Sequence, residues 1–308
     1  MHQGQTRYKG FNQHLKDVFG GKVYRVSLNT HLSCPNIDGT KAVGGCYFCN
    51  DDYLLANSYH KQQEISTQLE EGIAYLKQRH RGTNHFLAYF QNGTNTHAKA
   101  ETLRRFFELP LDHPEIKGMM ISTRPDCLGD DVLDLLSEIN ERTYLWVELG
   151  LQSAQNHVLK KINRAHSVEE FSEACYKLAE RKINNCAHMI LGLPDESKED
   201  MLAGADYLNK LPIQGVKIHN LFVTKYTVLE KWHREGKYTP LSLEEYTQLC
   251  VDYLERLRPD LVIHRINAHG PKDLTIAPDW SINKLATVNA IHDEIMRRDT
   301  HQGKLYTA

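Results

Sequence analysis

Short apolar runs alternate with helical patterns along almost the whole chain, and this alternation constrains the fold more than any other feature of the sequence. The expected strands are Lys22–Leu28, Phe86–Gln91, Gly118–Thr123, Tyr144–Gly150, Asn185–Leu191, Gly215–Leu221 and Asp260–Ile266. The expected helices are Gln62–Arg79, Ala98–Glu108, Asp130–Glu141, Ala154–Lys161, Val168–Arg181, Lys198–Lys210, Leu243–Arg258 and Ile282–Arg298. Two of these helices start with capping-box spacing, at Ser167 with Glu170 and at Ser242 with Glu245. Such alternation predicts a parallel sheet with right-handed crossovers.

The fold class expected from this pattern is α/β, with a parallel (β/α) barrel as the main unit. Runs such as MMIS and HMIL are apolar on consecutive positions, as is typical of strands that are covered on both faces. No linker-like tract or internal repeat interrupts the alternation. We therefore expect an N-terminal extension over residues 1–21, one barrel over residues 22–271, and a C-terminal helical extension over residues 272–308 that packs on the barrel. Segment Asn50–Lys61 lacks periodicity and is expected to be a loop.

The charge balance excludes some classes of function. Lys and Arg number 37 and Asp and Glu number 39, so the formal net charge is −2, which argues against a general nucleic-acid coat protein but allows a local basic patch. No apolar run is long enough to span a membrane, and the first residues lack a signal-peptide core. We expect a cytoplasmic protein with no membrane partner, in which the 7 cysteines stay reduced.

Cys34, Cys46 and Cys49 lie together in the stretch CPNIDGTKAVGGCYFC, directly after the first expected strand. Barrel enzymes carry their chemistry on the loops at the carboxyl ends of the strands, so this loop is the strongest candidate site. Three thiolates are one ligand short of an ordinary four-ligand metal site, whereas a [4Fe–4S] cluster held by three cysteines keeps one iron open. The alternatives are a zinc site completed by His31 or His60, a redox-active pair of Cys46 with Cys49, and buried cysteines that hold no ligand.

The other expected strands also end in polar or glycine-rich segments. These segments read QNGTNTH, STRPD, ELGLQS, LGLP, HNLFVTK and HRINAHG. Polar groups at so many strand ends would be costly if they served only packing, so they predict a single site along this edge of the sheet. Cys175, Cys186 and Cys250 are expected to be small buried residues, whereas Cys127 follows one of the polar strand ends.

Taken in order, these motifs resemble the radical SAM superfamily, in particular the branch related to the Elongator catalytic subunit and the oxygen-independent coproporphyrinogen oxidases. Within that branch the chain is most similar to a group of bacterial proteins tied to modification of the tRNA wobble uridine. The resemblance extends from about Lys22 to Pro271 and is carried by eight segments in order. They are Cys34–Thr40, Gly44–Cys49, Ser122–Leu128, Tyr144–Gln152, Ile162–His166, Gly192–Pro194, His264–Arg265 and Trp280–Lys284.

The resemblance implies a partial TIM-like (β/α)6 barrel with terminal extensions. It implies that Cys34, Cys46 and Cys49 hold a [4Fe–4S] cluster whose open iron is chelated by S-adenosyl-L-methionine (SAM). One electron, from a reductant such as flavodoxin or ferredoxin, would then cleave SAM to a 5′-deoxyadenosyl radical, which removes a hydrogen atom from the substrate. The cofactors supply this chemistry, and the protein supplies positioning and the exclusion of side reactions.

The resemblance also implies a set of SAM contacts at the strand ends. Carried over motif by motif, they are Gln91, Asn92, Gly93, Thr94, Ser122, Arg124, Glu148, Gln152, Arg164, Met189, Leu191, Gly192, Leu221, Phe222 and Val223. Arg164 would pair with the methionine carboxylate, for which a guanidinium is well suited. Met189–Leu193 would form a shelf under the adenine. The alternatives are that Glu148 is an interior ion-pair partner, that Arg164 lies on a solvated helix face, and that Met189 is a core residue.

Further polar residues at the strand ends are the candidates for substrate contact: Asp126, Cys127, His219, Lys225, His264, Arg265 and His269. His264 and Arg265 are neighbours in one strand and point in opposite directions, so only one of them is expected to reach the cavity. Cys127 is a second-site thiol, a radical quencher or a packed cysteine. The resemblance implies a tRNA substrate modified on its wobble-uridine side chain. The alternatives are a small-molecule substrate and a zinc-stabilised module that binds RNA or protein without catalysis.

Overall fold

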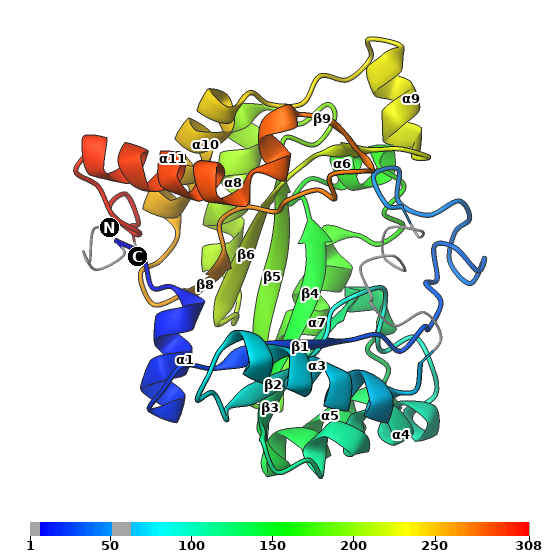
Figure 1. Cartoon of the computed structure of the whole chain (residues 1–308). Helices are drawn as coiled ribbons and strands as arrows, with labels where there is room; N and C mark the ends of the chain where they lie inside the picture. The colour runs from blue at the N-terminus through cyan, green and yellow to red at the C-terminus, as the bar shows by residue number, and fades with distance from the viewer. Residues whose placement is uncertain (1–6, 51–62, 308) are drawn as a thin grey trace.

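A computed structural model describes residues 7–50 and 63–307, and its largest element is one sheet of seven parallel strands (Figure 1). The strands, in their order across the sheet, are β1 (Tyr24–Leu28), β2 (Phe86–Phe90), β3 (Ile116–Thr123), β4 (Tyr144–Gln152), β5 (Asn184–Leu191), β6 (Gly215–Asn220) and β8 (Val262–Arg265). The sheet curls into a half-barrel, and β1 and β8 are its two ends. The predicted partial (β/α) barrel is therefore confirmed, with seven strands rather than the six that the resemblance implied.

Helices between the strands cover the outer face of this sheet. They are α3 (Ile65–Arg79), α4 (Ala100–Leu111), α5 (Asp130–Arg142), α6 (Asn156–Lys161), α7 (Val168–Glu180), α8 (Lys198–Asn209) and α10 (Leu243–Arg256). Both predicted capping boxes are present, since the hydroxyls of Ser167 and Ser242 accept from the N–H groups of Glu170 and Glu245. Gln62, where one helix was expected to begin, and residues 51–61 of the expected loop lie outside the described residues.

Side chains alternate between the two faces of each strand, and this produces two separate cores. On the outer face, Leu145, Val147 and Leu149 of β4 are completely buried against the helices. On the inner face, Trp146 of the same strand belongs to a smaller apolar cluster. A fully buried side chain of this size contributes about 1.5–3 kcal/mol relative to an exposed one, so the outer core supplies most of the stability and leaves the inner face free for polar groups.

Helix α1 (Phe11–Phe19), which was not predicted from the sequence, packs into the inner cluster. Phe11 stacks on His264 with ring centroids 3.9 Å apart and meets Trp146 edge-on at 5.8 Å. The four-residue spacing of Phe11, Leu15 and Phe19 is the signal that could have identified this amphipathic helix. Residues of the expected N-terminal extension thus form part of the interior of the half-barrel.

The chain after β8 packs against the outside of the sheet and its helices. It forms β9 (Thr275–Ala277), the 3₁₀ helix η2 (Asp279–Ile282) and helix α11 (Lys284–Arg297). Strand β9 pairs in antiparallel fashion with β7 (Val223–Thr224), which is followed by α9 (Val228–Arg234). Helix α11 runs beside α10 and buries Ile291 and Ile295 in the outer core (Figure 1). Within the described part of the chain, no helix has both the length and the apolar character required to cross a bilayer.

Candidate active site

The loop after β1 brings Cys34, Cys46 and Cys49 to one cavity at the carboxyl edge of the sheet. The Cys49 N–H donates to the Cys46 carbonyl over 2.8 Å, which closes a tight turn between these two cysteines. Gly44 and Gly45, just before Cys46, have φ values of 81° and 68°, a region that glycine enters without steric cost. The loop is therefore preshaped by its glycines to direct all three thiols into the same space.

Asn36, which is completely buried, ties this loop to the segment after α6. Its Nδ2 donates to the carbonyls of Asn163 (2.6 Å) and Arg164 (3.1 Å) and lies 3.5 Å from the sulfur of Cys46. Asn163 returns the contact by donating to the carbonyl of Gly45 over 2.8 Å. Neither asparagine was predicted as a site residue, although both lie in the motifs CPNIDGT and INRAH. Together they fix the position of the Cys46 thiol relative to the Arg164 backbone.

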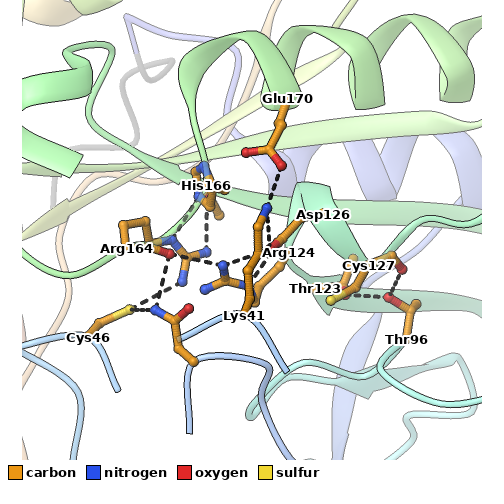
Figure 2. Close-up of polar contacts among 12 residues, drawn as sticks. Lys41, Cys46, Thr96, Thr123, Arg124, Asp126, Cys127, Arg164, His166 and Glu170 are labelled. Atoms are coloured by element: carbon orange, nitrogen blue, oxygen red, sulfur yellow. Dashed lines mark hydrogen bonds and ion pairs between the residues drawn. The ribbon is translucent and has the colours of Figure 1, made fainter. Parts of the chain in front are cut away.

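The guanidinium of Arg164 points toward the cysteine loop rather than along a solvated helix face (Figure 2). Its Nη1 lies 3.5 Å from Cys46 Sγ, and its Nη2 donates to the carbonyl of Gly150 over 2.8 Å. Its Nε donates to Nε2 of His166 over 2.9 Å. Burial, followed by repulsion from Arg164, lowers the pKa of His166 to about 3, so this ring stays neutral and can accept that bond. The buried arginine is thus held in one orientation at the edge of the cavity.

Arg124 and Asp126 bind each other (Figure 2). Nε and Nη2 of Arg124 donate to the two carboxylate oxygens, each over 2.9 Å. Burial alone would raise the pKa of Asp126, but Arg124 and Lys41 outweigh it and lower the pKa to about 2. Nη1 of Arg124 is buried and has no hydrogen-bond partner among the described residues. This guanidinium therefore keeps one donor for a ligand in the cysteine cavity.

The cavity has a volume of about 480 Å³ and gathers most of the predicted SAM contacts around the three cysteines. The predicted residues that line it are Gln91, Asn92, Gly93, Thr94, Ser122, Arg124, Gln152, Arg164 and His219. His188, which was not predicted, also lines it, and so does Ile190, which lies within the predicted shelf Met189–Leu193. Strand alternation is the signal for both, because they occupy inward positions of β5.

Met189 and Leu191 do not line this cavity, because the same alternation turns their side chains into the outer core. The expected shelf can therefore use only the backbone of these two residues, and Ile190 supplies the apolar side chain. Gly192 is buried and its carbonyl accepts from the hydroxyl of Tyr238 over 2.8 Å. Met189 is therefore a core residue, which was the alternative to a direct contact with adenine.

Glu148 lies beneath the cavity, inside the half-barrel, at the centre of a polar network. Its carboxylate accepts from Tyr89 (2.5 Å), Ser122 (2.9 Å), His188 (3.0 Å), Lys217 (2.8 Å) and His264 (3.1 Å). Burial would raise the pKa of Glu148, but Lys217 and the two histidines hold it well below its usual range. Burial lowers the pKa of Lys217 to about 8, against the attraction of Glu148. Glu148 thus has the position of an interior ion-pair partner and lines no part of the cysteine cavity.

A second cavity, of about 240 Å³, adjoins the first and shares Cys49, Gln91 and Asn92 with it. The predicted residues that line this second cavity but not the first are Leu221, Phe222, Arg265 and His269, and His219 lines both. Val223 lies instead in β7.

Arg265 reaches the second cavity, whereas His264 faces Glu148. Lys225 is exposed and donates to the carbonyl of Asp273 over 2.9 Å, away from both cavities.

Asp126 and Cys127 were expected to face the cysteine cavity, but they line a separate cavity of about 600 Å³. The reason is the 3₁₀ helix η1 (Pro125–Cys127), which turns the chain outward directly after Arg124. The carbonyl of Cys127 accepts from the Thr96 hydroxyl over 2.6 Å (Figure 2). Burial, followed by the charge of Asp126, raises the pKa of the Cys127 thiol to about 12, so the thiol stays protonated. These properties favour the packed-cysteine alternative over a reactive thiol.

Comparison with known proteins identifies the family. A model described as the Radical SAM superfamily matches residues 39–208, and one described as the Radical_SAM C-terminal domain matches residues 213–297. The chain belongs to the radical SAM superfamily. YtqA of Bacillus subtilis (strain 168) is 41% identical over 98% of this chain and 94% of its own length. A protein named tRNA uridine(34) acetyltransferase, from Dehalococcoides mccartyi (strain CBDB1), is 31% identical over 48% of this chain and 32% of its own length.

Among solved structures, the radical SAM fold of this chain is similar to that of archaeal Elp3 from Methanocaldococcus infernus. That structure, which lacks residues 1–46 of Elp3, superposes with a TM-score of 0.71 over 91% of this chain and 64% of the archaeal chain, at 17% sequence identity. A likeness at this level of identity concerns the fold. Together with the sequence matches, it supports the expected relationship to the Elongator branch of the superfamily.

Radical SAM enzymes use a [4Fe–4S] cluster and SAM, and the cysteine loop suits such a cluster. Among the described residues, the one set of three His, Cys or carboxylate ligand atoms within 4.8 Å of one another is that of Glu148, Cys186 and His188. At least two of the three loop sulfurs therefore lie more than 4.8 Å apart, whereas sulfurs around one zinc ion lie about 4 Å apart at a Zn–S distance of about 2.3 Å. This spacing counts against the zinc alternative. Lys217, bound to Glu148, disfavours a cation in the tighter set.

We predict that Glu148→Gln destabilises the fold by roughly 3–5 kcal/mol, because it leaves the buried ammonium of Lys217 without a counter-charge. The free energy of unfolding in urea, followed by circular dichroism, measures this effect. The double variant Glu148→Gln/Lys217→Met is the control, and it should recover part of the loss because both charges are gone. A single-variant loss below about 1 kcal/mol would contradict the importance of this pair.

Proposed function

We propose that this radical SAM enzyme modifies the side chain of the wobble uridine in tRNA. One observation carries the proposal: the three-cysteine cavity adjoins a second cavity lined by basic and amide residues, so a polar substrate group has a place beside the cofactor site. The similarity of about half of this chain to a protein named for its action on tRNA uridine(34) supports RNA as the substrate class. When bound, the cluster and SAM supply a 5′-deoxyadenosyl radical that can remove a hydrogen atom from the substrate.

In this proposal the residues of the chain bind and orient the cofactors. Cys34, Cys46 and Cys49 hold the cluster, and Arg164, held beside Cys46, binds the methionine carboxylate of SAM. The free Nη1 of Arg124 donates to a polar group of SAM. The remaining SAM contacts in this proposal are Gln91, Asn92, Gly93, Thr94, Ser122, Gln152, Leu221 and Phe222.

Glu148 acts in this proposal as a positioning residue rather than a SAM contact. Its carboxylate holds Ser122 and His188, and both of these side chains line the cysteine cavity. Because Glu148 is itself completely buried, it affects the cofactors only through the side chains that it orients.

We further propose that a small one-electron carrier, such as flavodoxin or ferredoxin, docks on the cysteine loop in the cytoplasm. Val43 is 74% exposed and Ile37 is 40% exposed, and both lie between Cys34 and Cys46. An exposed apolar surface this close to the cluster ligands suits a transient electron-transfer partner, whose interfaces are small.

Cys46→Ala is expected to abolish both cluster retention and SAM cleavage, because two thiolates cannot hold the cluster. Iron content and formation of 5′-deoxyadenosine after anaerobic reconstitution and reduction measure these two properties. Cys175→Ala is the matched control, since Cys175 is completely buried in the outer core away from the loop. A Cys46→Ala protein that binds about four irons and still cleaves SAM would refute the assignment of this ligand.

Arg164→Ala is expected to weaken SAM binding by about tenfold to a hundredfold while the cluster is retained, because a charge-assisted hydrogen bond is lost. Equilibrium binding of SAM to the anaerobically reconstituted enzyme measures this change, and the visible absorption of the cluster monitors its integrity. Arg164→Lys, which keeps the charge but not the guanidinium, should fall between the two. Unchanged SAM affinity in Arg164→Ala with an intact cluster would rule out this role.

Deletion of the gene is expected to change the wobble-uridine nucleosides of cellular tRNA. Mass spectrometry of nucleosides from the deletion strain, from the parent and from a strain complemented with the intact gene makes the comparison. We expect one modified uridine to disappear and its precursor to accumulate, with reversal by the intact gene and no reversal by the Cys46→Ala gene. An identical nucleoside profile in deletion and parent strains would count against tRNA and favour a small-molecule substrate.

A further inference from the structure

The second cavity, defined above by its 240 Å³ volume, is lined by two basic side chains. Lys217 and Arg265 line it, and His188, His219 and His269 add three imidazoles. The site therefore combines hydrogen-bond donors with positive charge, directly beside Cys49 and the cofactor cavity.

Arg265 is the side chain whose charge is not compensated. No hydrogen bond or ion pair to its guanidinium occurs among residues 7–50 and 63–307. Lys217, in contrast, is paired with Glu148 at 2.8 Å. Burial is the largest cause that lowers the pKa of His219 well below its usual value, and repulsion from Arg265 is the next. A partly buried guanidinium without a partner is unfavourable unless an anion joins it.

Arg25 and Lys284 add positive charge from the neighbouring side. Arg265 lines both the second cavity and a further cavity that also contains Arg25 and Lys284. Burial and then repulsion from Arg265 lower the pKa of Lys284, so the two cations act on each other. Glu148 is an interior carboxylate whose charge acts on Arg25, but its oxygens are already used by five donors.

Asn220 provides a second, independent sign of a missing ligand. Asn220 is one of the residues that line the second cavity and is 2% exposed, and its Oδ1 accepts from the N–H of Ala268 over 2.8 Å. Its Nδ2 has no hydrogen-bond partner among the described residues. A buried amide donor costs free energy when it is left unpaired, so a ligand acceptor is expected to meet it.

We infer that the second cavity binds an anionic group of the substrate, a carboxylate or a phosphate, between the guanidinium of Arg265 and Nδ2 of Asn220. This inference rests on the proposed function for the identity of the substrate, but not for the anion site itself. A guanidinium and an amide donor together match the oxygens of either anion. The anion anchors the substrate beside Cys49 and selects for charged substrates over neutral ones.

The anion has two possible sources in a modified tRNA, an acidic substituent on the wobble base and a backbone phosphate. Three probes separate them: uridine, uridine 5′-monophosphate, and a uridine whose base carries a substituent that ends in a carboxylate. Dissociation constants are measured by calorimetry with the full-length, anaerobically reconstituted enzyme in the presence of SAM. We expect one of the two anionic probes to bind at least about tenfold more tightly than uridine.

Two variants test the assigned residues. Arg265→Gln is expected to remove this preference, and Asn220→Asp is expected to do the same, because it keeps the acceptor for Ala268 but replaces the free donor with a negative charge. Arg105→Gln is the control, since Arg105 is a highly exposed arginine of α4 paired with Glu101. Equal affinity for charged and neutral probes, or an unchanged preference in both folded variants, would overturn the anion site. Iron content and circular dichroism establish that each variant is folded.

The outcomes for the anion site and for the tRNA substrate remain distinguishable. If the deletion strain shows an altered uridine while no anionic probe is preferred, the anion site is wrong and the tRNA assignment stands. If the nucleosides are unchanged while an anionic probe is preferred and Arg265→Gln removes that preference, the anion site stands with a different substrate. Accumulation of a precursor with an acidic side chain, together with tighter binding of the carboxylate probe, assigns the anion to the base rather than to the phosphate.

Discussion

The inner face of the half-barrel depends on the ion pair between Glu148 and Lys217. Two charges this deeply buried are tolerated only when their remaining hydrogen-bonding capacity is used, and the carboxylate of Glu148 accepts from five side chains. Those donors come from β2, β3, β5, β6 and β8, so one carboxylate on β4 links most of the sheet. Ser122 and His188 are held by it and line the cysteine cavity. The ion pair thereby fixes one wall of the cysteine cavity through the side chains that Glu148 holds. Because the single carboxylate of Glu148 is paired with the ammonium of Lys217, it does not serve as a counter-charge for Arg265.

The cysteine loop is held by polar contacts to a different part of the chain, the segment after α6. Asn36 of the loop donates to the backbone carbonyl of Asn163, and the side chain of Asn163 donates to the backbone carbonyl of Gly45 in the loop. Arg164 approaches the sulfur of Cys46. Hydrogen bonds to sulfur and nearby positive charge are two of the factors that tune the potential of an iron–sulfur cluster. In the function proposed above, the same arginine also binds SAM, and a single buried side chain then connects the electronic environment of the cluster with the binding of SAM.

The sequence was sufficient to predict the order of the seven sheet strands and of most helices, and the clustering of polar strand ends, because both follow from periodicity and from the geometry of parallel sheets. The short helices α1 and α9 were not predicted. Ser122, Gln152 and Arg164 accordingly lie in the cavity where they were expected. The direction of individual side chains was predicted wrongly where a whole motif was assigned to the site without regard to strand alternation. In β5, Ile190 rather than Met189 faces the cavity. Contacts between residues that are distant in the sequence could not be predicted either. Neither the Glu148–Lys217 pair nor the outward turn of Asp126 at η1 follows from a local pattern, since both depend on how separate strands meet.

An incomplete barrel has two exposed strand edges, and the residues before β1 cover part of one of them. The edge of β8 is covered where Gly10 forms a bridge with Ile263, whose N–H donates to the Lys9 carbonyl over 2.7 Å. A covered edge cannot pair with another chain, which removes a common route to aggregation. Beside this bridge the interior still opens between β1 and β8, and Arg25, Arg265 and other basic side chains line that opening. The opening that results from an unclosed barrel is therefore lined by the same positive charge that faces the second cavity, and an anionic substrate is attracted to both sides of Arg265.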